Sequence, residues 1–233
     1  MDGIAQNILH IRERIAAAAQ RIGRSADDVL LLAVTKTVAP ERVDQALREG
    51  ITTVGESKLQ EAKQKIPLVS SRAHWHMIGH LQTNKARDAV GLFELIHSVD
   101  SVKLATEINK WAERVGKTQR ILLEVNLSGE SSKYGLKPDE LNAALEHIAA
   151  LERIQVEGLM TVPPIAEDAG KVRPYFQQLR DLREAAARKY NLVLPHLSMG
   201  MTSDFEVAVE EGSSIVRIGT AIFGERKRHE PEE

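Results

Sequence analysis

Cysteine is absent from the 233 residues of this chain. Disulfide bonds and cysteine-ligated metal sites are therefore excluded, and a cytoplasmic location is favoured. The chain also lacks an excess of charge of one sign, because 31 lysines and arginines stand against 33 aspartates and glutamates, for a net charge of -2. This balance supports neither nucleic-acid binding nor disorder.

Long apolar runs are missing as well. The N-terminus has no basic segment followed by an apolar one, so we expect no signal peptide. No run approaches the roughly 20 apolar residues that a membrane-spanning helix needs, so we expect no membrane partner. No linker-like segment divides the chain. We therefore predict a single domain over residues 1–233, with a frayed, charged tail at about 226–233.

The rest of the chain alternates between short apolar segments and amphipathic helices. An extra helix at about residues 2–22 carries isoleucines at 4, 8, 11 and 15 and precedes this alternation. Eight strand–helix units follow, with strands predicted at about 30–35, 53–56, 74–79, 95–99, 121–126, 154–160, 192–198 and 215–218. Such a series favours an α/β fold with a parallel sheet, and eight units favour a closed (β/α)8 or TIM barrel. An open doubly wound sheet is the alternative, but no glycine-rich loop follows the first strand.

The first predicted strand is followed by a lysine. Leu30 to Val34 are all apolar, which is typical of a strand buried on both faces, and Lys36 comes two residues later. Its amine either reaches past the strand end into solvent or lies in a pocket as a nucleophile toward a carbonyl. In a barrel, functional groups gather at the C-terminal ends of the strands, which is where Lys36 stands.

The loops after the seventh and eighth strands carry glycine and hydroxyl residues. The first contains Ser198 and Gly200, and the second contains Gly219 and Thr220. Barrels commonly bind phosphate in these two loops, because backbone N–H groups, hydroxyls and helix N-termini favour an anion. The alternative is that these are ordinary turn and cap residues. In a closed barrel the first and eighth strands are neighbours, so the Lys36 amine and the phosphate site would face the same mouth. This pair of groups suits a phosphorylated aldehyde that is bound as a Schiff base.

Arg217 suggests which aldehyde this is. It lies two residues before Gly219, where its guanidinium could approach the pyridine nitrogen of pyridoxal 5'-phosphate (PLP) and disfavour protonation of that nitrogen. Alternatively, Arg217 pairs with a barrel carboxylate such as Glu124. Met160, at the end of the sixth strand, either packs against the ring or belongs to the core. The residues alone leave PLP and the sugar phosphate of a Schiff-base aldolase both open. No metal site is predicted, because the pair His74 and His76 has no third ligand nearby.

Six stretches resemble the YggS/PROSC family of pyridoxal phosphate homeostasis proteins, in order and along almost the whole chain. They are LLAVTK at 31–36, WHMIGHLQTNK at 75–85, SKYG at 132–135, GLMT at 158–161, LSMGMTSD at 197–204 and VRIGTAIFG at 216–224. The family resembles the barrel domain of alanine racemase, a fold-type III enzyme. The resemblance implies that Lys36 carries PLP as a Schiff base, that Ser198, Gly219 and Thr220 bind its phosphate, and that Arg217 faces the pyridine nitrogen.

The resemblance also implies a function. The family is thought to keep PLP and vitamin B6 in balance without strong catalysis, so PLP-dependent apo-enzymes are the implied recipients, and we expect a monomer. Racemases of this fold add a C-terminal β domain and a tyrosine opposite the lysine, whereas this chain ends at Glu233 and only Tyr134 is expected near the mouth. A fold-type III amino-acid racemase or decarboxylase is the alternative function. Ser57 stands where the family usually has asparagine, which puts that residue's contribution in doubt.

Overall fold

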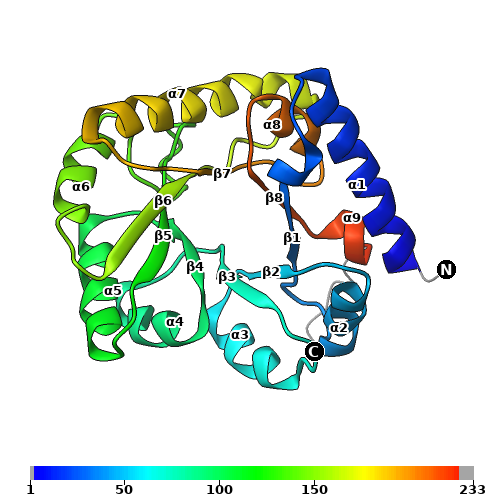
Figure 1. The fold of residues 1–233 in the computed structure, drawn as a ribbon, viewed down its shortest axis with the longest axis horizontal. Coiled ribbons are helices and arrows are strands. Elements are labelled where there is room, and N and C mark those ends of the chain that lie inside the picture. Colours follow the sequence, from blue (N-terminus) through cyan, green and yellow to red (C-terminus); the bar gives the residue numbers. More distant parts are fainter. Residues whose placement is uncertain (1–2, 226–233) are drawn as a thin grey trace.

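A closed barrel of eight parallel strands forms the centre of the protein. The computed structural model describes residues 3–225 and has helices around the outside of this barrel (Figure 1). The strands are β1 Leu30–Val34, β2 Thr53–Glu56, β3 His74–Met77, β4 Leu95–Val99, β5 Gln119–Glu124, β6 Ile154–Met160, β7 His196–Ser198 and β8 Ile215–Ile218. Each strand pairs with the next, and β1 closes the barrel by pairing with β8. The predicted TIM barrel is confirmed.

Helices connect successive strands and cover the outer face of the barrel. They are α1 Gly3–Arg21, α2 Pro40–Arg48, α3 Leu59–Lys65, α4 Ala86–Leu92, α5 Val102–Arg114, α6 Leu141–Ile148, α7 Arg173–Tyr190, α8 Phe205–Glu210 and α9 Thr220–Phe223, with short 3-10 turns at 26–28, 66–68, 83–85 and 169–172. The additional N-terminal helix α1 is present as expected. Its four isoleucines are buried, and it lies across α8 and α9 (Figure 1).

The side chains of each strand alternate between the two faces of the sheet and so form two separate apolar regions. The interior of the barrel contains Leu32, Val34, Leu95, Leu122, Met160 and Ile215. A larger region lies between the strands and the helices, and it includes Leu31 and Ala33 of β1. Because successive side chains of a strand point to opposite faces, the even-numbered residues of β1 face the interior. Lys36 continues this even-numbered series at the C-terminal end.

The seventh strand is shorter than predicted. The sequence indicates a strand at 192–198, but β7 comprises only His196–Ser198. Asn191 ends α7 in the left-handed region with φ 51°, and the N–H of Leu192 donates back to the carbonyl of Ala187 at 3.1 Å. Val193 is 85% exposed, so its apolar side chain takes no part in the sheet. The short apolar run belongs to a helix-to-strand connection.

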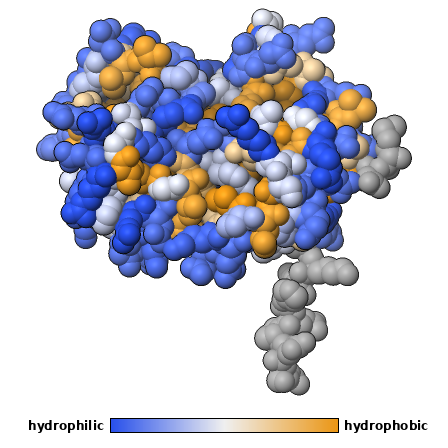
Figure 2. Space-filling view, turned by 60° about the horizontal axis from the view of Figure 1, so that its bottom comes forward, coloured by the Kyte–Doolittle hydropathy of each residue, from blue (hydrophilic) through white to orange (hydrophobic). Residues whose placement is uncertain are grey.

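The surface shown in Figure 2 is mixed in character. Apolar areas are scattered among polar and charged residues on that face. Within residues 3–225, no helix combines the length and the apolar character needed to cross a membrane. The tail predicted at about 226–233 lies outside the described residues.

Candidate functional site

Lys36 lies in a tight turn at the C-terminal end of β1. The carbonyl of Thr35 accepts the N–H of Val38 at 3.0 Å, which closes a turn over residues 35–38. Thr37 has a φ of 63°, a left-handed conformation that is uncommon for a β-branched residue. Lys36 is half-buried in this turn. The strand end and the turn together bring the lysine to the C-terminal mouth of the barrel.

Arg217 lies inside the barrel, on the strand next to β1. It is 5% exposed, and its guanidinium donates to Ser198 Oγ at 2.7 Å and to the carbonyl of Thr161 at 3.0 Å. Among residues 3–225 no carboxylate lies within 4 Å of it, so the alternative of a direct ion pair with Glu124 is not observed. Burial lowers the pKa of Arg217 to about 10, although the charges of Glu124 and Asp204 act in the opposite direction. A buried cation whose counter-charges are distant suits a ligand that brings an acceptor or an anion.

Ser198 joins Arg217 to a chain of buried histidines. The hydroxyl of Ser198 lies 2.9 Å from Nδ1 of His97, and Nε2 of His97 lies 3.0 Å from Nδ1 of His76. Burial lowers the pKa of His76 to about 3, and it lowers the pKa of His97 well below its usual value, so both rings are neutral at neutral pH. The Ser198 hydroxyl is thus bonded to both His97 and Arg217, and its predicted contact with a phosphate stays a prediction. The sequence alone did not reveal His97, because it is the single histidine of a short strand and its partners come from β3 and β7.

The two predicted phosphate loops lie side by side. The carbonyl of Gly200 accepts the N–H of Arg217 at 2.9 Å, which ties the loop after β7 to β8. Gly200 has a φ of 94°, and a Cβ there would lie 2.6 Å from the Cβ of Ala208, so the position requires glycine. Gly219 precedes α9, which begins at Thr220. The first N–H groups of a helix have no acceptor within the helix, so this loop directs backbone donors toward the mouth.

The remaining predicted residue, Met160, belongs to the barrel interior. It is 1% exposed, it packs in the same apolar cluster as Leu122 and Leu95, and it lies opposite Ser198 in the β6–β7 register. This accounts for the methionine as a core residue next to the site. Its contact with a ligand ring stays a prediction.

An acidic group with an unusual pKa lies at the end of β5. Burial and the nearby charge of Asp100 raise the pKa of Glu124 from 4.5 to about 7, whereas Arg217 lowers it. Asp100 also lies 3.2 Å from Nδ1 of His80, and the His80 ring stacks on Tyr134 with centroids 3.5 Å apart. A pocket of about 200 Å³ opens between Glu124, Tyr134 and the following loop. Titratable groups of both charges therefore gather around Arg217. Of the other tyrosines, Tyr175 and Tyr190 both lie on α7, as expected.

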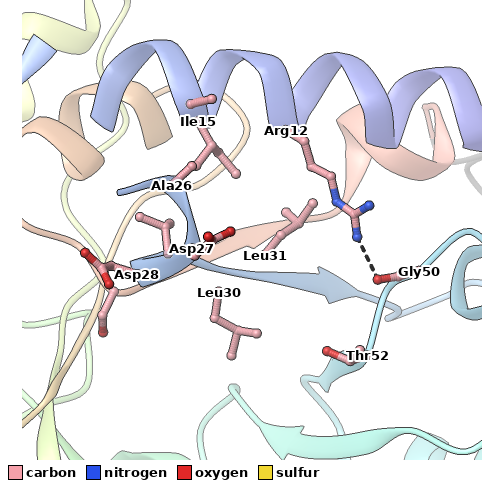
Figure 3. A pocket seen from close by; sticks show the side chains of 12 residues that line it. Arg12, Ile15, Ala26, Asp27, Asp28, Leu30, Leu31, Gly50 and Thr52 are labelled. Carbon is pink, nitrogen blue, oxygen red and sulfur yellow. Dashed lines mark hydrogen bonds between the residues drawn. The ribbon is translucent and has the colours of Figure 1, made fainter. Parts of the chain in front are cut away.

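Two further hollows lie at the opposite end of the barrel. A groove of about 690 Å³ runs between α1 and the start of β1, with Arg12 at one side and Asp27 and Asp28 at the other (Figure 3). Its lining residues on the barrel side precede or begin their strands, whereas the sites of barrel enzymes follow the strands. A smaller pocket of about 230 Å³ is lined by His74, His76 and His196 among others. Within the described part of the chain, no group of three or more potential ligands is arranged to hold a metal ion.

Comparison with known proteins connects this geometry to one family. The family model for the alanine racemase N-terminal domain matches residues 7–227. A pyridoxal phosphate homeostasis protein of Aquifex aeolicus is 45% identical over 223 residues, which cover 95% of this chain and 98% of that protein. A protein of the same name from Pseudomonas aeruginosa is 41% identical, with 97% of each chain covered.

Solved structures agree with the sequence relatives. PipY of Synechococcus elongatus, solved with PLP bound, has a TM-score of 0.82 at 34% identity. The match covers 92% of this chain and 100% of the PipY chain. Alanine racemase of Clostridium difficile has a TM-score of 0.72 at 15% identity. The match covers 98% of this chain but only 58% of the racemase chain. At that identity, the racemase supports the fold alone.

Proposed function

This chain belongs to the family of pyridoxal phosphate homeostasis proteins built on the alanine racemase N-terminal domain, and we propose that it binds PLP and acts in PLP (vitamin B6) homeostasis. One observation carries this proposal. Lys36 follows β1, Arg217 lies on the adjacent β8, and Arg217 is tied directly to Gly200 of the loop after β7. An amine, a buried cation and backbone donors thus converge on one mouth, which suits a phosphorylated aldehyde with a basic ring nitrogen.

Each group has a separate role in this proposal. When bound, PLP would supply an aldehyde, and Lys36 would hold it through its side-chain amine. Backbone N–H groups of Gly200, Gly219 and Thr220 hold the phosphate. Arg217 donates to the ring nitrogen and, as a permanent cation, disfavours its protonation, which weakens the ring as an electron sink.

Ser198 and Met160 would complete the site. Ser198 orients Arg217 through the 2.7 Å hydrogen bond to its hydroxyl. A contact between Ser198 and the phosphate would be a second role of this residue. Met160 would supply an apolar contact to the bound ring. The buried guanidinium fits this group. Ser198 and Thr161 already accept hydrogen bonds from it, so a ring nitrogen would add a further acceptor, and a phosphate would add the negative charge that Glu124 and Asp204 provide only at a distance.

A non-catalytic carrier role follows from the same arrangement. A weak electron sink suits storage and delivery of PLP better than turnover, and the relatives are named for homeostasis. PLP-dependent apo-enzymes would be the recipients, and the chain would act as a cytoplasmic monomer. The absence of cysteine supports this location.

A second candidate function is favoured by Glu124. A carboxyl group with a pKa of about 7, at the end of β5, is suited to proton transfer at neutral pH, as a racemase or decarboxylase would require. Turnover assays over a panel of amino acids distinguish the two functions. Racemisation or decarboxylation at about 1 s⁻¹ or faster would favour the enzyme.

An absorbance spectrum tests PLP binding at Lys36. The protein reconstituted with PLP should absorb at about 420 nm, a property of the Schiff base, and Lys36→Ala should abolish this band. Lys63→Ala is the matched control, because Lys63 is an exposed lysine on α3 that pairs with Asp88. A protein that stays colourless after reconstitution would refute the proposed function.

A further inference from the structure

A buried cluster of charges lies directly behind the turn that carries Lys36. Lys65, the last residue of α3, is only 5% exposed. Its ammonium donates to the carbonyl of Thr35 at 2.6 Å, to Glu56 Oε1 at 2.6 Å and to Glu61 Oε1 at 2.7 Å. These three acceptors use all three donors of the ammonium. Buried lysines are rare in proteins and are usually paired when they occur. A lysine that is buried with all three donors bonded therefore needs a structural explanation.

Both neighbours of Lys36 are tied to this cluster. The hydroxyl of Thr35 donates to Glu56 Oε1 at 2.7 Å, while its carbonyl accepts from Lys65. The N–H of Thr37 donates to Glu61 Oε1 at 2.5 Å. The backbone is therefore held on each side of Lys36 by groups that come from β2 and α3.

The conformation of Thr37 indicates what this hold achieves. Among residues 3–225, Thr37 and Asn191 are the only non-glycine residues with positive φ, and Asn191 stands at a helix end, where that is ordinary. A β-branched residue in this region is strained and keeps its conformation only where its surroundings impose it. The carboxylate of Glu61 binds both the Thr37 N–H and the Lys65 ammonium. It can therefore hold Thr37 in the left-handed conformation.

We propose that Glu56, Glu61 and Lys65 are positioning residues for Lys36: they hold the strained 35–38 turn that presents the lysine amine to the aldehyde of PLP. This inference rests on the proposed role of Lys36. It assigns Glu61 a specific task, because loss of its carboxylate lets Thr37 relax to negative φ and moves the neighbouring amine. The phosphate donors and Arg217 lie on other strands, so they stay in place.

The test separates formation of the Schiff base from binding of the ring and the phosphate. Pyridoxine 5'-phosphate has both of these groups but no aldehyde, so its affinity reports the pocket without Lys36 chemistry. In Glu61→Ala, the rate constant of Schiff-base formation with PLP at 420 nm should fall about tenfold, the population change expected for one strained residue. The affinity for pyridoxine 5'-phosphate should stay unchanged, and Lys63→Ala should alter neither quantity.

Rescue distinguishes positioning from general support. Asparagine accepts the left-handed conformation far better than threonine, so adding Thr37→Asn to Glu61→Ala should restore most of the lost rate. Wild-type kinetics in Glu61→Ala would overturn the proposal, and so would a parallel loss of analogue affinity that Thr37→Asn does not rescue. If Lys65→Met folds, it should show the same reduced rate of Schiff-base formation and the same unchanged analogue affinity as Glu61→Ala. If it does not fold, Glu61→Ala alone tests the proposal.

Amide hydrogen exchange in the protein without ligand keeps this test independent of PLP binding. The N–H groups of Thr37 and Val38 are bonded within the cluster and the turn, so their exchange should accelerate about tenfold in Glu61→Ala. If the wild-type protein binds neither PLP nor its analogue, the proposed function fails, while accelerated exchange still supports the hold on the turn. Unchanged exchange overturns it.

Discussion

Replacing Glu124 by glutamine should stabilise the protein at neutral pH, because this carboxyl lies where its charge is disfavoured. Glu124 is 8% exposed, and burial together with the charge of Asp100 raises its pKa from 4.5 to about 7 in the folded protein. Between these two values the folded state binds more protons than the unfolded state. The free energy of unfolding must then fall as pH rises through this window.

The size of the effect follows from the two pKa values. One pKa unit corresponds to about 1.4 kcal/mol, so ionisation of Glu124 should cost about 1.4 kcal/mol of stability at pH 5.5 and about 3 kcal/mol at pH 7. Glutamine has nearly the same shape and carries no charge. Relative to their difference at pH 4, the variant should therefore gain about 3 kcal/mol over the wild-type protein by pH 7.

Other buried groups also have shifted pKa values, but they do not disturb this comparison. Burial raises the pKa of Glu56 and of Asp204, which lowers stability with rising pH in the same way. The lowered pKa values of His76 and His97 act in the opposite direction, because the unfolded chain binds the extra protons. All four contributions are common to both proteins, so they cancel in the difference.

Urea unfolding followed by circular dichroism measures the difference at pH 4, 5.5, 7 and 8, with both proteins free of ligand. The reasoning predicts a gap that opens between pH 4 and pH 7 and then stays nearly constant. A gap that stays constant within about 0.5 kcal/mol over the whole range would refute it, since an unperturbed carboxyl has no such linkage.

Three further substitutions test the candidate site, and two of them have a matched control elsewhere in the chain. Gly200→Ala should destabilise by about 2 kcal/mol or more, because the new Cβ would lie 2.6 Å from the Cβ of Ala208 at a positive φ. Gly91→Ala on α4, where a Cβ meets nothing within 4 Å, should instead stabilise by about 0.5–1 kcal/mol in the same urea experiment. Arg217→Glu should weaken PLP binding at least about tenfold by placing a third carboxylate near Glu124 and Asp204, and an unchanged affinity and spectrum would show that Arg217 does not face the ring. His97→Leu should cost about 1–3 kcal/mol of unfolding free energy, because His76 and Ser198 lose a buried partner, whereas His147→Leu on the surface of α6 should cost far less.

Local patterns predicted the architecture because they depend on residues that are close in sequence. The alternation of apolar strands with amphipathic helices indicated a barrel, and its eight units required β1 to meet β8. The same reasoning failed at 192–195, because three apolar residues after a helix resemble a strand whether or not they pair. Val193 shows the difference, since only the folded chain reveals that its side chain is exposed.

The fold, the place of Lys36 after β1 and the positions of the two glycine-containing loops could all be read from local patterns. The partners of these residues could be identified only in the folded protein. Arg217 bonds to Ser198 and Thr161, which are 19 and 56 residues away, and the turn at Lys36 depends on Lys65, which is 30 residues from Thr35. The physical reason is that burial, pKa and hydrogen bonding of a side chain depend on neighbours in space. Those neighbours come from other strands and helices, and no local pattern specifies them.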